Sequence, residues 1–313
     1  MNRTCTNIII SLLGMVFLFA VSLHPGTTLA GSLDTKAIEQ AFGKPGEMKD
    51  DVYKMSLPRK DLSVSLNGVK LRPGFALGTW IAFKQTGNDA VLDGDLVLAE
   101  PEVGSVFKKL QQEGIEVSAL HNHLIGETPK LMFLHIAGKG DAGKMAMAVK
   151  EALRLTGTPM ESQPVKATPT AKATPTAMSP TTEEHDFDVG IIDKELGHTG
   201  KLKDGVLHVS VSRPETIKMH GATLPPSMGM ATAINFQSGE GNKVVATGDF
   251  VMNRDDVNRV TKALAEHGIL VTALHNHLVH GSPDLYFMHF WADDTAEKVA
   301  KGLRAGLDAM KKG

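Results

Sequence analysis

The spacing of apolar residues predicts strands and helices that occur twice along the chain. Apolar and polar residues alternate over 93–99, which indicates a half-buried β-strand. Val103, Val106 and Leu110 then recur at helical spacing, and Pro101 and Gly114 mark the two ends of this helix. A strand over 115–123, a loop over 124–129, a strand over 130–137 and a helix over 140–155 are expected to follow. Before them we expect a short helix at 34–43 and strands near 52–57, 62–66 and 76–84.

The same pattern returns about 154 residues later. The segment AFGKPGEMKDDVYKMSLPR (41–59) matches ELGHTGKLKDGVLHVSVSR (195–213) without a gap. The offset is 153 between 66–83 and 219–236, and 154 again between GDLVL (94–98) and GDFVM (248–252). The chain is therefore an internal repeat, and each copy is expected to fold in the same way.

Each copy predicts an α+β domain, an antiparallel or mixed sheet with helices on one face and a β-α-β-β-α core. The step from 93–99 to 115–123 is expected to be a right-handed parallel crossover. Because a duplicated domain often reproduces a symmetric dimer, we expect the two repeats to form a pseudo-dimer within one chain.

Two segments fall outside the repeats. Residues 1–30 combine Arg3, an apolar run over 8–21 and the small-residue site Thr28-Leu29-Ala30, the layout of a signal peptide cleaved after about Ala30. Residues 157–185 are rich in Pro, Thr and Ala and are expected to form a linker. The first repeat domain then spans 31–156 and the second 186–313. An uncleaved N-terminal anchor is the alternative for the first segment.

Composition narrows the classes of function. The formal net charge is −2, with no basic excess, so nucleic acid is not an expected partner. The single cysteine, Cys5, lies upstream of the apolar run, so a mature chain would have neither disulfides nor thiolate metal ligands. We find no nucleophile motif, phosphate loop or cofactor fingerprint, so the sequence names no substrate. After signal cleavage no stable membrane span is expected, and the location is expected to be periplasmic or secreted.

Histidines are the most informative polar residues. Of the thirteen in the chain, six are retained at matching positions of both repeats: His121 and His275, His123 and His277, His135 and His289. Residues two apart in a strand share a face, so each H-x-H pair points to one side of its sheet. If 115–123 and 130–137 form a hairpin, His135 lies beside that pair. Three imidazoles on one face can hold a divalent transition metal, with zinc the default and copper or iron possible.

This arrangement predicts a metal site in each repeat with an open coordination position. Glu127, in the loop between the ligand strands, is the candidate fourth ligand or general base. Its counterpart is Gly281, so any metal-dependent hydrolysis is expected in the first repeat. The alternative is a non-catalytic envelope interaction module, whose histidines satisfy hydrogen bonds in the core.

Two further retained pairs admit two interpretations each. Asp95 and Asp249 either orient the histidines or simply end a Gly-Asp turn, and the turn is the preferred interpretation. Arg59 and Arg213 either bind an anionic group or are ordinary surface residues.

Several motifs together resemble a known family. ALHNHL at 119–124 and 273–278, the following P-x-L-x-F-x-H, the GD-[LF]-V-[LM] strand and PPSMGMATAINF at 225–236 are similar to the LppY/LpqO family of exported bacterial proteins, a domain of unknown function. The resemblance covers both repeats. It implies a tandem domain in the bacterial envelope or periplasm, and the missing lipobox cysteine implies a soluble form. The family has no established reaction, so the resemblance does not indicate one. The family's acidic residue after the histidine pair matches Glu127, whereas His280-Gly281-Ser282 departs from it.

Overall fold

The computed structural model describes residues 31–160 and 186–310. The predicted signal peptide and residues 161–185 of the predicted linker lie outside this range. Residues 157–160 are still attached to the first repeat, because the Gly157 amide donates to Oε1 of Glu102 and Thr158 is buried.

The first repeat follows the predicted order of elements. It contains α1 (Thr35–Phe42), β1 (Glu47–Lys49), β2 (Val52–Pro58), β3 (Ser65–Leu66), β4 (Val69–Lys70), α2 (Pro73–Ala76), β5 (Gly78–Thr86), β6 (Asp89–Ala99), η1 (Glu100–Glu102), α3 (Val103–Gln112), β7 (Glu116–His121), β8 (Leu131–Gly140) and α4 (Ala142–Leu153). The short helix α2 was not predicted.

The second repeat has matching elements. They are α5 (Val189–Leu196), β9 (Lys201–Lys203), β10 (Val206–Ser212), β11 (Ile217–Met219), β12 (Ala222–Leu224), η2 (Pro226–Met228), β13 (Ala231–Ser238), β14 (Val244–Asn253), η3 (Arg254–Asp256), α6 (Val257–Glu266), β15 (Leu270–His275), β16 (Gly281–Ser282), β17 (Leu285–Asp294) and α7 (Ala296–Met310).

The two large sheets have the same strand order. The first is β1-β2-β5-β6-β8-β7, and the second is β9-β10-β13-β14-β17-β15 when read in the same sense. β7 and β8 form the expected antiparallel hairpin, and β6 also pairs antiparallel with β8. β6 and β7 are therefore parallel, with β8 between them. The α+β class with two similar halves is confirmed.

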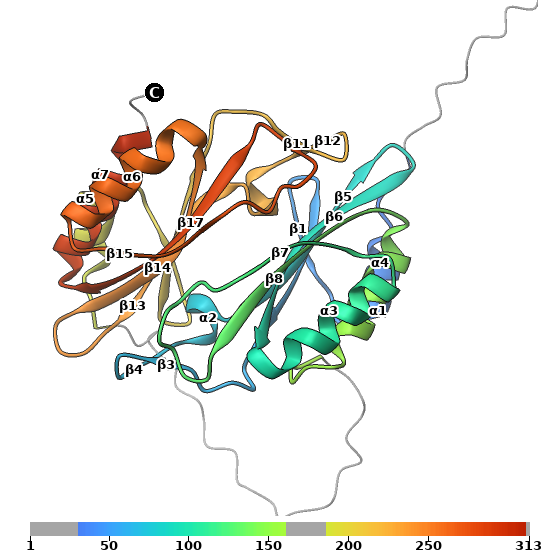
Figure 1. The fold of residues 1–313 in the computed structure, drawn as a ribbon, viewed down its shortest axis with the longest axis horizontal. Coiled ribbons are helices and arrows are strands. Elements are labelled where there is room, and N and C mark those ends of the chain that lie inside the picture. The colour runs from blue at the N-terminus through green and yellow to red at the C-terminus, as the bar shows by residue number, and fades with distance from the viewer. Residues whose placement is uncertain (1–30, 161–185, 311–313) are drawn as a thin grey trace, which may run out of the picture. The chain divides into compact units, whose positions relative to one another are not determined.

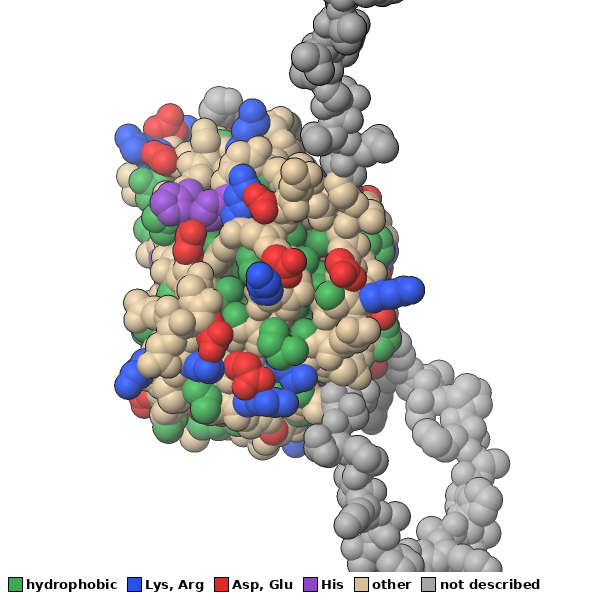
Figure 2. Space-filling model, turned by 90° about the vertical axis from the view of Figure 1, so that its right-hand side faces the viewer, with side chains coloured by type: hydrophobic (Ala, Val, Ile, Leu, Met, Phe, Trp, Pro, Cys, Tyr) green, Lys and Arg blue, Asp and Glu red, His purple; other side chains and the backbone are tan. Residues whose placement is uncertain are grey.

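Helices cover the outer face of each sheet, and the inner faces meet (Figure 1). Local signals set the helices: Asp34, Asp141 and Asp188 each accept an N-terminal amide, and Gly43 and Gly197 end α1 and α5 with positive φ. On the face seen in Figure 2, acidic and basic side chains of the described residues are interspersed.

Each repeat extends an arm over the inner face of the other. The first arm, residues 62–77, packs against Val206, Val245 and Trp291 of the second repeat. The second arm, residues 217–230, packs against the first repeat in a cluster that includes Val52, Ala82, Val91 and Ala137. Hydrogen bonds join the first arm to the second sheet, from Asn235 Nδ2 to the Phe75 carbonyl (3.1 Å) and from Gln237 Nε2 to the Lys70 carbonyl (2.9 Å). Lys54 Nζ of the first sheet donates to the Ser227 carbonyl of the second arm (3.4 Å). Neither inner face is closed without the other repeat.

Arg59 is a structural residue and not a surface one. Its side chain has 0% exposure and binds Asp61, Glu102 and the Val97 carbonyl. Arg213 makes the corresponding contacts with Glu215 and the Val251 carbonyl.

No helix in residues 31–160 or 186–310 combines the length and the apolar character needed to cross a bilayer.

The shared inner core predicts that both repeats unfold together. The only tryptophans are Trp80 in the first repeat and Trp291 in the second, so Trp80→Phe and Trp291→Phe each leave one reporter. We expect the remaining fluorescence and the far-UV circular dichroism of each variant to change at the same urea concentration. Phe75→Ala removes a buried side chain that contacts the other repeat. It should lower the free energy of unfolding by roughly 3 kcal/mol, and both reporters should show the same fall in the urea midpoint. Separate transitions for the two tryptophans would contradict the shared core.

Candidate functional site: a histidine cluster between the repeats

The six retained histidines come together between the two sheets. His121 and His275 end β7 and β15, and His135 and His289 lie within β8 and β17. In the sheet registers, Ala119 faces His135 and Ala273 faces His289, each beside an irregularity in the edge strand. These registers place His121 beside His135 and His275 beside His289, as predicted. His123 and His277 lie just beyond the ends of β7 and β15, so the prediction of a single strand carrying each H-x-H pair is wrong.

Contacts between the repeats follow a two-fold pattern. The ring centroids of His121 and His275 are 3.7 Å apart. His123 stacks on His289, and its repeat equivalent His277 stacks on His135, both at 3.7 Å. A pair of contacts in which each residue meets its partner's counterpart is the signature of an isologous interface. The histidines therefore form one cluster across the interface and not two separate groups.

Two sets of three imidazoles in the described chain have ligand atoms within 4.8 Å of one another. The first is the predicted set His121, His123 and His135, and the second is His121, His275 and His289. In the second repeat, His121 from the first repeat thus takes the place expected for His277.

The tautomer of His289 is fixed by the backbone. Its Nδ1 lies 3.0 Å from the Gly248 carbonyl, which can only accept, so Nδ1 carries the proton. Nε2 therefore has a free lone pair, and it faces His275 Nε2 at 3.0 Å and His121 Nε2 at 3.3 Å. A backbone carbonyl on the far nitrogen is the usual way to orient a metal-binding imidazole.

Gly94 and Gly248, which precede Asp95 and Asp249, lie where a larger residue would not fit. A Cβ at Gly94 would lie 2.9 Å from the Trp80 carbonyl, and one at Gly248 would overlap the Ala233 backbone. Both glycines thus allow neighbouring strands to approach closely in mid-sheet. Asp95 and Asp249 are consequently in the centres of β6 and β14, so the turn interpretation of the Gly-Asp pair is wrong.

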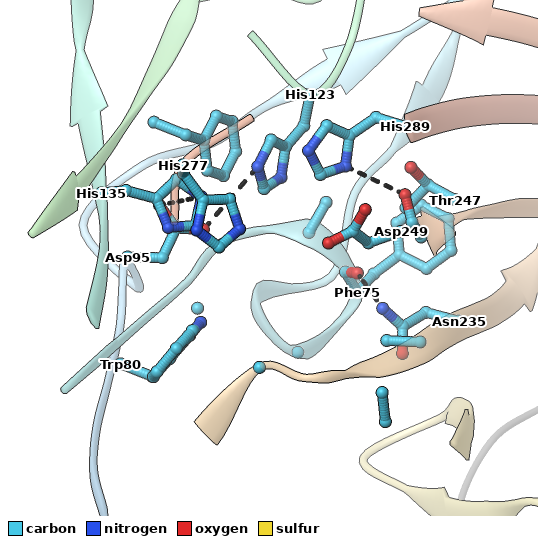
Figure 3. A pocket seen from close by; sticks show the side chains of 18 residues that line it. Phe75, Trp80, Asp95, His123, His135, Asn235, Thr247, Asp249, His277 and His289 are labelled. Carbon is cyan, nitrogen blue, oxygen red and sulfur yellow. Dashed lines mark hydrogen bonds and ion pairs between the residues drawn. The ribbon is translucent and has the colours of Figure 1, made fainter. Parts of the chain in front are cut away.

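The two aspartates lie opposite the histidines of the next strand. Asp95 is in register with His135, and Asp249 with His289. Asp95 Oδ2 lies 3.7 Å from His123 Nε2, and Oδ1 lies 3.9 Å from His135 Nε2 (Figure 3).

Burial favours the neutral form of every group in the cluster, so it lowers the histidine pKa values and raises the aspartate pKa values. It lowers the pKa of His121 to about 3, with a further contribution from His275, and lowers the pKa of His275 itself to about 4. The pKa values of the other four histidines are also lowered, mainly by burial. Burial raises the pKa of Asp95 to about 7. At neutral pH the six imidazoles are uncharged and are therefore available as ligands.

A cavity of about 210 Å³ adjoins the cluster (Figure 3). His123, His135, His277 and His289 line it together with Asp95 and Asp249, whereas His121 and His275 do not. Aromatic side chains form other parts of the wall: Phe75, Trp80 and Phe133. The cavity thus combines polar groups on one side with apolar surface, the usual character of a small-molecule site.

Glu127 does not line this cavity. Its side chain is 7% exposed, and its Oε1 accepts a hydrogen bond from the Leu131 amide at 3.0 Å. This contact braces the loop that carries the H-x-H pair. The catalytic role of Glu127 stays a prediction.

The first H-x-H segment is also tied to β15 across the interface. Asn122 donates to the Thr272 carbonyl (3.1 Å), and the Thr272 hydroxyl donates to the His123 carbonyl (2.6 Å). The asparagine of ALHNHL therefore holds the first histidine pair against the second repeat.

Sequence reasoning missed the aromatic residues of the site. Trp80 has Ala233 as its repeat counterpart, so comparison of the repeats does not select it, yet it lines the cavity and Lys54 Nζ lies 4.2 Å from the centroid of its ring. Phe75 belongs to the unpredicted helix α2 and meets Trp291 edge to face. The signal that could have identified both is their difference between the repeats, since a shared site gains specificity where the copies diverge.

Comparison with known families agrees with the repeat. The model of one family, described as Domain of Unknown Function (DUF1259), matches residues 36–155 and again residues 191–309. The chain belongs to this DUF1259 family. It carries the DUF1259 domain in two tandem copies, and all six clustered histidines lie within them.

Other comparisons add no function. No curated protein matches the chain significantly. Among solved structures, it is similar to a trimeric bacterial microcompartment shell protein, PduB, at 12% identity and a TM-score of 0.21, covering 84% of this chain and 89% of that one. EtuB from Clostridium kluyveri matches at 10% identity and a TM-score of 0.20, with 85% and 91% covered. Scores this low do not establish a shared fold.

The lowered histidine pKa values predict that the metal-free protein is acid-labile. The unfolded state binds more protons below about pH 6.5, so stability is full above this pH and lost as pH falls. His121 alone accounts for on the order of 2 kcal/mol between pH 7 and pH 5. Asp93, Asp95 and Asp249 oppose this loss because their pKa values are raised in the folded state, but the six histidines outnumber them.

Urea unfolding at pH 7 and pH 5 in a chelator measures the effect. We expect His121→Asn to shrink the loss by about 2 kcal/mol. His267→Asn, at an exposed helix end, should leave the loss unchanged. A stability that does not depend on pH over this range would contradict the burial of neutral imidazoles.

Proposed function

We propose that this chain is an exported protein of the LppY/LpqO type that binds a divalent transition metal between its two repeats. The N-terminal pattern of residues 1–30 and the motif resemblance support export to the periplasm. The histidine cluster supports metal binding. The DUF1259 family gives the tandem architecture but no reaction.

The observation that carries the proposal is the convergence of Nε2 atoms from His121, His275 and His289. Tetrahedral Zn²⁺ holds imidazole nitrogens at about 2.0–2.1 Å, so neighbouring ligand atoms lie roughly 3.3 Å apart. The separations of 3.0 and 3.3 Å from His289 Nε2 are close to this value. Neutral imidazoles and the fixed tautomer of His289 fit the same role.

Unsatisfied ring nitrogens argue against a purely structural network. Within the described residues, five of the six histidines have a buried ring nitrogen without a hydrogen-bond partner: Nδ1 of His121, His135, His275 and His277, and Nε2 of His123. Each such atom costs about 1–3 kcal/mol when it stays unpaired. These are not the Nε2 atoms that converge at His289, so an ion there would not pair them, but their cost argues that the cluster is not a fully satisfied hydrogen-bond network.

The donor set favours zinc, with copper or iron as alternatives. All the ligands are imidazoles, supported by carboxylates, and Cys5 is the only thiol in the sequence. Imidazole ligands suit zinc, copper and iron.

Metal analysis of untagged protein tests the proposal. We expect at least one tightly bound ion per chain, and His289→Asn should weaken the affinity at least about 100-fold while circular dichroism stays native. His267→Asn is the matched control and should bind as the wild type does. If no stoichiometric metal binds and His289→Asn changes only stability, the alternative of a non-catalytic interaction module is correct.

A second candidate function is metal-dependent hydrolysis at the cavity. The supporting observation is that carboxylates and imidazoles line one wall of a small aromatic cavity. The screen uses zinc-loaded protein with ester, phosphoester and amide substrates, and no turnover of any of them would remove this candidate.

The Glu127→Gln variant decides the role of Glu127 in any activity found. The glutamine amide oxygen can still accept the Leu131 amide proton, so we expect both stability and kcat to be retained. A large fall in kcat with stability unchanged would instead make Glu127 the general base.

A further inference from the structure

The two sets of three histidines share His121, which can bind only one ion through its Nε2. If His121 binds with His275 and His289, then His123 and His135 remain as ligands for another ion. This inference rests on the proposed function, because it assumes that His121, His275 and His289 hold one ion. His123 and His135 then lack a third ligand from His121. Asp95 lies against both of them.

We propose a second divalent cation site, held by His123, His135 and Asp95, that faces the cavity. Each carboxylate oxygen of Asp95 is directed at one imidazole, at 3.7 Å from His123 Nε2 and 3.9 Å from His135 Nε2. These distances are too long for hydrogen bonds. Each is about half an ångström longer than the spacing of roughly 3.3 Å between ligands that share a tetrahedral ion, and each involves a different oxygen, so the side chains would have to close on the ion as it binds.

The polar atoms of this group are buried and unpaired. Asp95 Oδ1 and His123 Nε2 have no hydrogen-bond partner among the described residues. A buried carboxylate beside neutral imidazoles needs a compensating cation. Burial raises the pKa of Asp95 and the charge of Lys54 lowers it, but Lys54 Nζ donates to the Ser227 carbonyl at 3.4 Å and forms no ion pair with this carboxylate. A bound divalent cation would satisfy the carboxylate and both ring nitrogens at once.

The second repeat does not offer an equivalent site. The counterpart of this group is Asp249 with His277 and His289, but His289 Nε2 already faces His121 and His275. Within the described residues no ion pair joins Asp249 to a histidine, whereas Asp95 makes two. The pseudo-symmetric cluster therefore provides one inter-repeat site and one site in the first repeat.

The two sites differ in their access to the cavity. His123, His135 and Asp95 all line it, next to Phe133 and Trp80, whereas only His289 of the inter-repeat ligands does. The second ion would therefore have the greater contact with the cavity. Three protein ligands leave an open position on the second ion, as is usual at reactive centres. That position would accept water or a small ligand with an oxygen donor.

Zinc titration of chelator-stripped, full-length protein tests the second site. Calorimetry should give two ions per wild-type chain and one per Asp95→Asn chain. His123→Asn, which removes another ligand, should also retain one. Co²⁺ absorption spectra, recorded in parallel, should lose one component in both variants. Asp93→Asn is the matched control, because it removes a buried carboxylate two residues away on β6 and should still bind two ions.

The possible outcomes separate the two proposals. One ion in the wild type, unchanged in Asp95→Asn, would overturn the second site and leave the first intact. Two ions in Asp95→Asn would remove Asp95 as a ligand and overturn the site as described. No ion in the wild type would overturn the proposed function together with this inference. Circular dichroism of each variant establishes that it is folded before its stoichiometry is compared.

Discussion

The burial of polar groups between two sheets is the constraint on which this structure depends. Six imidazoles and two carboxylates lie where a core would ordinarily be apolar. They can remain there only because the reciprocal arms close the interface around them. The same closure makes the imidazoles neutral, which is the state that a metal ion requires. Stability and ligand chemistry are therefore properties of one interface.

Duplication explains how such an interface arises with few specified residues. One set of three histidines, placed near a two-fold axis, supplies six ligands when it occurs twice. The stacked pairs His123–His289 and His135–His277 retain this symmetry. The surrounding positions do not, since the repeat counterpart of Trp80 is Ala233 and that of Asp93 is Thr247. The copies have thus kept the centre and diverged around it.

Local features were predictable from the sequence, and the assembly was not. The apolar spacing indicated the hairpin that carries His121 and His135, because strand pairing across a short loop is a local event. The joining of His121 with His275 depends on contacts between residues far apart, which no local pattern encodes. Asp95 was misread because a Gly-Asp pair is common in turns. Only the close approach of β5, visible in three dimensions, explains Gly94 in mid-strand.

The covalent connection between the repeats has a consequence for how the site assembles. In a dimer of separate chains, the fraction of complete sites would fall upon dilution. Here the two halves of the cluster belong to one polypeptide, so the second half is present at an effective concentration set by the connecting segment. Assembly is unimolecular, and the number of complete sites does not depend on how much protein is present.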